Sequence, residues 1–482
     1  MAIWSITRLS RARPSSTLQD TYKARDNHNT AATENTQPSV ARSPAFAPPT
    51  VWVFRLLQLP SMGTTVPDDI LLLLFAQATP LPWPYVEYDA ERAKAPFALA
   101  SVCQRWRILA LSTASLWTYF GFPASIRAQT AHLPRLRLLL SRSGDAEVDV
   151  VFLVSDTSVS EEPASRDILR AISTIASRWR YVNLDVPTSC VSIFSGAFQQ
   201  KWKCLRFLSL QYWKKIEKLP LAHRLAKLYI DCKGLETSNL PISMPNMNNL
   251  SINGDGGIYT NNLLVAIAQQ LTDLSILEGI TKSPQQPILF PRLRSLAVDD
   301  VSYLDHIIAP ALQTLTFNTS HLGSPPRLTH FTSVTHLCLY GTVHETFLSS
   351  LQQFTQIVHL SFEVSDHSKR SWPGIDQYII LGQFFTAVRR SSFNSAPVWP
   401  RLAHIRFGDS GSMGSNAIAD PQDVIDFVVH RNASQFGPEW ADTNNVPTML
   451  QTVTVDFNDA PDLLISELNK IFSTTKDADV RN

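Results

Sequence analysis

The sequence has few of the features that mark secreted, metal-binding or membrane-spanning proteins. Its five cysteines are scattered, at positions 103, 190, 204, 232 and 338, and none forms a C-x-x-C pair. This pattern lacks the common zinc and redox motifs and does not fit a disulfide framework, so we expect a reducing compartment, cytoplasmic or nuclear. The longest apolar run, residues 70–76, is far shorter than the roughly 20 residues of a membrane-spanning helix.

An excess of charge of either sign is also missing. The 482 residues include 42 lysines and arginines against 41 aspartates and glutamates, which gives a formal net charge of +1. A balanced chain has no overall attraction for nucleic acid or for an anionic membrane surface. We therefore expect neither as a partner, and no motif in the sequence indicates a cofactor or a metal.

An apolar pattern at helical spacing occupies residues 66–117. Pro67 suits a first helical turn, and Asp68 and Asp69 follow where a helix dipole favours acidic side chains. Residues 70–75 are apolar nearly all round, which predicts a helix that is buried on more than one side. A second stretch places on one face Leu99, Val102, Cys103, Trp106, Leu109 and Ala110.

The pattern predicts three short helices, with a proline-rich loop at about 76–96 between the first two. So small a core is marginal on its own, and a partner surface would account for the amount of apolar area.

This segment resembles the F-box, the short helical module by which substrate receptors attach to a ubiquitin-ligase scaffold. The matching residues are Val66, Pro67, Asp69, Ile70 and Leu71 at its start, Ser101, Val102, Cys103, Arg105, Trp106 and Arg107 in its middle, and Ser112, Ser115, Leu116 and Trp117 at its end. Val66 and Asp69 stand where leucine and glutamate are usual, and the loop is an insertion.

The resemblance implies a substrate-recognition subunit of a Skp–cullin–F-box ubiquitin ligase, which is not itself an enzyme. Its partners would be a Skp-family adaptor, a cullin scaffold and a target protein that the sequence does not identify. The residues expected to contact the adaptor or to support that contact are Pro67, Ile70, Leu71, Leu74, Val102, Trp106 and Trp117. The alternative is a repeat scaffold whose helical module only caps the repeats.

An internal repeat follows, with the pattern apolar-x-x-apolar-x-apolar. Its central residues are spaced by 19 to 24 positions, at Leu208, Leu228, Leu250, Leu274, Leu296, Leu315, Leu337 and Leu360. An early unit begins at 179, and two later units lie at 402–407 and 450–455. This period is typical of leucine-rich repeats, whose units stack because none can bury its own apolar edge. A β-sandwich with regular strand spacing is the alternative.

The predicted fold class is therefore α/β, a small helical module followed by a leucine-rich-repeat solenoid with parallel strands on the concave face and helices on the convex face. The predicted ranges are a disordered segment at 1–58, the helical module at 59–120, a connector and N-terminal cap at 121–178, the solenoid at 179–475 with insertions at about 363–400 and 408–449, and a tail at 476–482. Arginines beside apolar residues near the N-terminus leave a transit peptide as an alternative for the first segment.

Strand alternation sends the residues before and after each central leucine, and the third residue after it, to the concave face. The predicted target-binding residues are Tyr229, Asp231, Asp299, His336, Tyr340, His359, Glu363 and Arg406. Because Asp231, Asp299, Glu363 and Asp456 share the third position, one hypothesis is a basic target segment. Chance surface polarity explains the same acidic column.

Two patterns resemble catalytic or metal sites. The run 408–411, Gly-Asp-Ser-Gly, is similar to the nucleophile motif of trypsin-like proteases, but it follows a repeat strand and no matching histidine motif precedes it. His336, His359 and His404 occupy the same position in three repeat units. We interpret the run as a connecting loop and the histidines as polar residues of a binding face.

Overall fold

The computed structural model describes most of the chain from Val66 to Asp479. The described residues are 66–79, 88–122, 129–153, 163–186, 188–213, 219, 221–232, 244–254, 257–277, 286–319, 328, 330–340, 348–364, 385, 388, 398–409, 421–432, 448–455 and 462–479. The segment predicted to be disordered, 1–58, lies outside these residues, as do most of the two predicted insertions.

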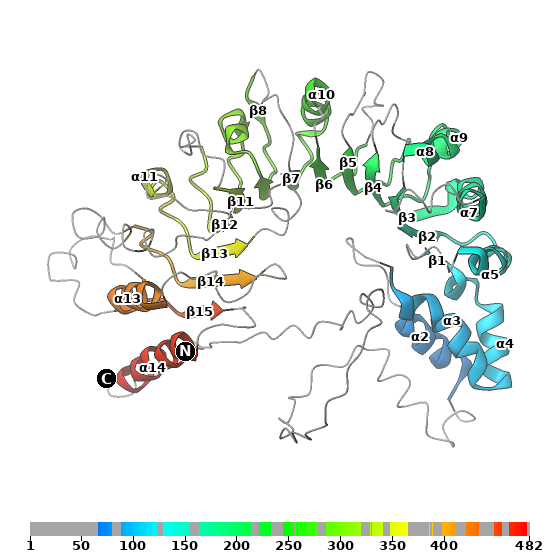
Figure 1. Ribbon diagram of the computed structural model, residues 1–482, viewed down its shortest axis with the longest axis horizontal. Coiled ribbons are helices and arrows are strands. Elements are labelled where there is room, and N and C mark those ends of the chain that lie inside the picture. The colour runs from blue at the N-terminus through cyan, green and yellow to red at the C-terminus, as the bar shows by residue number, and fades with distance from the viewer. Residues whose placement is uncertain are drawn as a thin grey trace, which may run out of the picture.

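A single 13-stranded sheet runs through the protein, with its strands in sequence order and every neighbouring pair parallel. Its strands are β1 (Tyr119–Phe122), β2 (Val148–Leu153), β3 (Trp179–Asp185), β4 (Phe207–Trp213), β5 (Lys227–Cys232), β6 (Asn249–Asn253), β7 (Asp273–Leu277), β9 (Ser295–Val298), β11 (Thr314–Asn318), β12 (His336–Tyr340), β13 (His359–Val364), β14 (His404–Asp409) and β15 (Thr452–Val455). Figure 1 shows these strands along the inner side of an arc.

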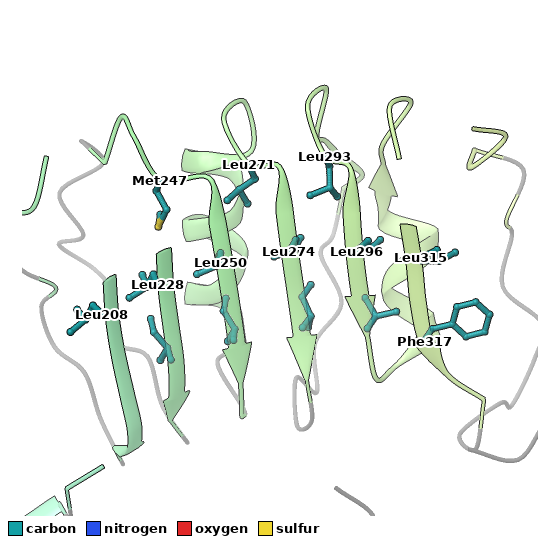
Figure 2. Close-up of a cluster of buried hydrophobic side chains, with 14 of the residues drawn as sticks. Leu208, Leu228, Met247, Leu250, Leu271, Leu274, Leu293, Leu296, Leu315 and Phe317 are labelled. Carbon is teal, nitrogen blue, oxygen red and sulfur yellow. The ribbon is translucent and has the colours of Figure 1, made fainter. Parts of the chain in front are cut away.

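The leucines predicted to share one position lie in register across the sheet. Leu208 is opposite Leu228, and the pairing continues unit by unit to Leu360. Figure 2 shows part of this row, with Met247, Leu271 and Leu293 in a second row at the strand starts. All these side chains are buried, and strands such as β7 and β11 alternate strictly between buried and half-buried residues. The predicted parallel α/β architecture is confirmed.

Helices cover the outer side of the arc (Figure 1). They include α5 (Gln129–Ser143), α7 (Pro163–Thr174), α8 (Thr188–Val191), α9 (Ser195–Phe198), α10 (Gly257–Ile267), α11 (Leu348–Leu351) and α13 (Pro421–Asn432), with short turns η4 (Ala176–Arg178), η5 (Ser192–Phe194) and η6 (Val301–His306). A small parallel pair joins two neighbouring units: β8 (Ile288–Leu289) lies between β7 and β9, and β10 (Ile307–Ile308) lies between β9 and β11. The helix α14 (Asp462–Asp479) closes the C-terminal end. One continuous core joins these elements.

The sheet begins earlier than the predicted start of the solenoid at residue 179. β1 and β2 are its first two strands, so the predicted connector at 121–178 contributes to the sheet. The predicted insertion at 408–449 likewise contains α13, which buries Val424 and Val428 as a convex helix does. The strand β2 lacks the leucine pattern because it is buried at five of its six positions and shows no alternation.

Before β1 the chain forms four helical pieces, which we call the helical module: α2 (Asp68–Ala78), α3 (Ala90–Val102), α4 (Gln104–Ser112) and η2 (Ala114–Trp117). The predicted loop at 76–96 is too long, because α3 begins at Ala90 and continues through Pro96. The stripe from Leu99 to Ala110 is divided between two helices at Cys103, whose extended backbone starts α4 and whose sulfur accepts from the N–H of Trp106.

Candidate partner-binding surfaces

The helical module exposes apolar side chains. The structure describes ten exposed large apolar side chains, and four of them lie in the module, Ile70, Leu73, Val102 and Ile108. The other six are spread over the rest of the described chain, and no helix or strand there carries more than one of them. We call the four residues that share the small module the exposed apolar cluster; exposed apolar area of this kind is available for a partner to cover.

The predicted adaptor-binding residues divide into two sets. Pro67, Ile70 and Val102 are exposed, and Leu74, one turn after Ile70, is half-buried. Leu71, Trp106 and Trp117 are at most 2% exposed, so they can only support a contact from within. Sequence reasoning missed Leu73 and Ile108, the most exposed apolar residues of the module at 63% and 61%.

Aromatic contacts hold the module together. Trp106 meets Phe75 edge to face, with ring centroids 4.9 Å apart, and Trp117 meets Phe97 in the same way at 5.2 Å. The indole N–H of Trp117 donates to the carbonyl oxygen of Ala110 over 2.7 Å. The apolar stripe that the sequence displays therefore joins α2, α3, α4 and η2 into one unit.

An arginine on α4 fixes the start of α2. Arg105 donates to the carbonyl oxygen of Val66 over 2.6 Å and forms an ion pair with Asp68. The contact brings the first turn of α2 beside the start of α4, which directly follows Val102. Pro67, Ile70 and Val102 are consequently presented near one end of the module.

The module is anchored to the sheet by a buried carboxylate. Asp149 on β2 is 0% exposed and pairs with Arg92 of α3 and with Arg180 of β3. Arg180 binds it through two N–H groups, at 2.9 and 2.8 Å. The guanidinium group of Arg92 also lies 4.4 Å from the ring centre of Tyr119, and burial raises the pKa of Tyr119 to about 12. A cavity of about 590 Å³ lies at this junction, lined by both arginines.

The concave face presents some of the predicted target-binding residues and not others. His336 and Arg406 are exposed, and Tyr229, Asp231 and His359 are half-buried. Asp299 and Tyr340 are each 7% exposed, and the hydroxyl of Tyr340 donates to the carboxylate of Asp299. This hydrogen bond stabilises the stacking of the repeats, and both side chains are too buried to offer much surface to a target protein. Glu363 lies opposite Tyr340 on β13, and its side chain is outside the described residues.

Three side chains on this face stack as a histidine ladder, His336, His359 and His404, from β12, β13 and β14. Their ring centroids are 4.2 and 4.3 Å apart, with the planes inclined by 8° and 12°. The Nδ1 atoms of the outer rings lie within hydrogen-bond distance of hydroxyls, His336 from Thr335 at 2.9 Å and His404 from Thr452 at 2.8 Å. Among the described residues no group of histidine, cysteine and acidic side chains is arranged to hold a metal ion.

Proximity within the ladder disfavours protonation. Burial, then the charges of His336 and His404, lower the pKa of His359 to about 4. Burial and His336 also lower the pKa of His404. At neutral pH His359 and His404 are accordingly uncharged aromatic rings on the concave face.

This arrangement predicts an acid-sensitive end of the protein. The folded state favours neutral His359, so its stabilisation is complete above the unfolded pKa of about 6.5 and is lost as the pH falls toward about 4. We expect the urea midpoint of the wild type to fall more steeply from pH 7 to 5 than that of His359→Gln. His223→Gln, at an exposed histidine outside the ladder, should retain the wild-type slope. Equal slopes for all three proteins would contradict this explanation.

The protease-like run adds no site to the described structure. Gly408 and Asp409 end strand β14, and Ser410 and Gly411 lie outside the described residues. None of the helices in the described ranges is long and apolar enough to cross a membrane.

Comparison with known proteins gives no family for this chain. No protein-family model matches the sequence, and no curated protein is significantly similar to it.

Proposed function

We propose that the chain is the substrate-recognition subunit of a Skp–cullin–F-box type ubiquitin ligase. The observation that carries the proposal is the exposed apolar cluster Ile70, Leu73, Val102 and Ile108 on the helical module, at the end of a long repeat structure. The F-box resemblance places Ile70 and Val102 in the adaptor-binding segment. In this role a Skp-family adaptor, held by a cullin scaffold, covers the cluster.

The repeats would then hold the target protein on the concave face. A receptor of this kind performs no covalent step. It contributes proximity, because it holds a target lysine within reach of a conjugating enzyme that the ligase brings to the same assembly. The free thiols of Cys103 and Cys204 are compatible with the reducing compartment, cytoplasmic or nuclear, that this role requires.

A leucine-rich-repeat scaffold with no role in ubiquitin transfer is the second candidate. One observation favours it. The module shares a continuous core with the sheet and is tied to it through Asp149, as a capping element is. A cap needs a polar outer face, however, whereas Leu73 and Ile108 are more than 60% exposed. That difference makes the ligase role the better proposal.

Substitution on the exposed cluster distinguishes the two candidates. We expect Ile70→Glu to weaken binding of a purified Skp-family adaptor by about 2 kcal/mol or more, because it places a charge in a desolvated contact. The folded state should tolerate the change, since Ile70 is 43% exposed. Calorimetric titration of the full chain with the adaptor measures the effect.

The matched control is Val429→Glu on α13, where the valine is 47% exposed on a helix at the other end of the protein. It should bind the adaptor as the wild type does. Equal binding by both variants would place the contact elsewhere, and an absence of adaptor binding by the wild type would favour the scaffold.

A further inference from the structure

The surroundings of the histidine ladder contain positive and neutral groups. On strands β11 to β15, the position of the ladder histidines and the next outward-facing position carry Thr314, Thr316, His336, Cys338, His359, Ser361, His404, Arg406, Thr452 and Thr454. These ten positions hold three histidines, one arginine and no carboxylate. Arg406 is exposed and lies opposite Ser361, two residues after His404.

Acidic residues occur only at the ends of these strands. Glu363 is two positions beyond Ser361, and Asp409 ends β14. No acidic side chain of the described part forms an ion pair with a ladder histidine. The ladder is therefore a group of proton acceptors with no acidic ion-pair partner among the described side chains, and an acidic ligand could supply one.

We propose that the histidine ladder binds an acidic segment of the target protein and takes up protons as it does so. The inference rests on the proposed role of the concave face. A carboxylate beside an imidazole favours the protonated ring, so the bound state holds more protons than the free state. Binding then strengthens as the pH falls toward the range in which the carboxylates themselves titrate.

The spacing of the ladder defines the kind of segment that fits. The central ring, His359, has a stacked neighbour on each side, whereas the outer rings, His336 and His404, each have one stacked ladder neighbour and one side on which no other ladder ring lies. The outer rings are about 8.5 Å apart, because the stacking distances of 4.2 and 4.3 Å add along the ladder. Side chains on one face of an extended chain repeat about every 6.8 Å. In an extended segment lying across the strands, acidic residues at alternate positions are therefore about 1.7 Å closer together than the outer rings, a difference that the flexible glutamate side chain can span.

The probe is a fluorescent ten-residue peptide of alternating serine and glutamate, titrated by anisotropy with the full chain at pH 7.5, 6.5 and 5.5 at constant ionic strength. Glutamate remains largely ionised over this range. We expect the affinity to increase about tenfold from pH 7.5 to 5.5, as an average uptake of about half a proton over these two pH units predicts. The triple variant His336→Gln, His359→Gln, His404→Gln should lose this pH dependence. Arg406→Gln should weaken binding equally at each pH.

Three results would overturn the inference: no binding of the acidic peptide at any of the three pH values, a pH dependence that survives in the triple variant, or preferential binding of a serine–lysine peptide. Circular dichroism at each pH establishes that the variants are folded. Adaptor binding is a separate measurement on the same proteins, and the triple variant should retain it. Adaptor binding without the pH-linked peptide effect rejects the ladder site alone, and the reverse result rejects the ligase role alone.

Discussion

Replacing Asp149 with asparagine should reduce the free energy of unfolding by about 3–5 kcal/mol, the cost of breaking a buried ion pair from one side. The carboxylate is 0% exposed and neutralises Arg92, which is 5% exposed, and Arg180. Asparagine keeps the volume but removes the carboxylate that pairs with both guanidinium groups, and Arg92 is the more deeply buried of the two. Within the described part of the chain, the Nε and Nη1 atoms of Arg92 have no hydrogen-bond partner that could compensate.

Urea unfolding of the full chain measures the loss. The control is Asp167→Asn, which removes an exposed pair with Arg170 one turn away on α7 and should change stability by less than about 0.5 kcal/mol. A loss below about 1 kcal/mol for Asp149→Asn would mean that Asp149 does not anchor the module to the sheet.

Trp106→Ala should cost about 3–5 kcal/mol, because it leaves a large cavity among buried residues. Trp106 is 2% exposed and lies edge to face against Phe75, so the loss falls on the contact between α4 and α2. We expect the helical module to become sensitive to protease at a concentration that leaves the wild type intact. Weaker adaptor binding would follow from unfolding of the module, since Trp106 does not reach the surface.

Two variants test this explanation. Trp106→Phe should lose clearly less, because it keeps a ring against Phe75 and removes an indole N–H that has no hydrogen-bond partner in the described structure. Ile108→Ala, in the same helix but 61% exposed, should remain within about 0.5 kcal/mol of the wild type. If Ile108→Ala destabilised the protein as much as Trp106→Ala, the module would be oriented differently from this description.

The repeat could be predicted from the sequence because its signal is periodic. Each unit places a leucine at the same point of a strand, and the register of Leu228, Leu250 and Leu274 follows from that spacing. The first two strands could not be found in the same way. β1 and β2 are buried on both faces beneath the helical module, so they lose the alternation that marks the later strands.

The candidate surfaces were predictable only in part, because exposure depends on packing. Leu71 was predicted to contact the adaptor or support that contact, and Leu73 was not, yet Leu71 is 1% exposed and Leu73 is 63% exposed. Asp299 and Tyr340 belong to different repeats, 41 residues apart, and only the stacking of units brings the carboxylate to the hydroxyl. The position shared by the three histidines was visible in the sequence, whereas the parallel stacking of their rings required the structure.

Hydrogen exchange of the full chain with and without a Skp-family adaptor tests the central claim most directly. The account predicts slower exchange in α2, α3 and α4, around the cluster of Ile70, Leu73, Val102 and Ile108, with the strands of the concave face unchanged. An unchanged exchange pattern at saturating adaptor, or protection confined to the repeats, would contradict it.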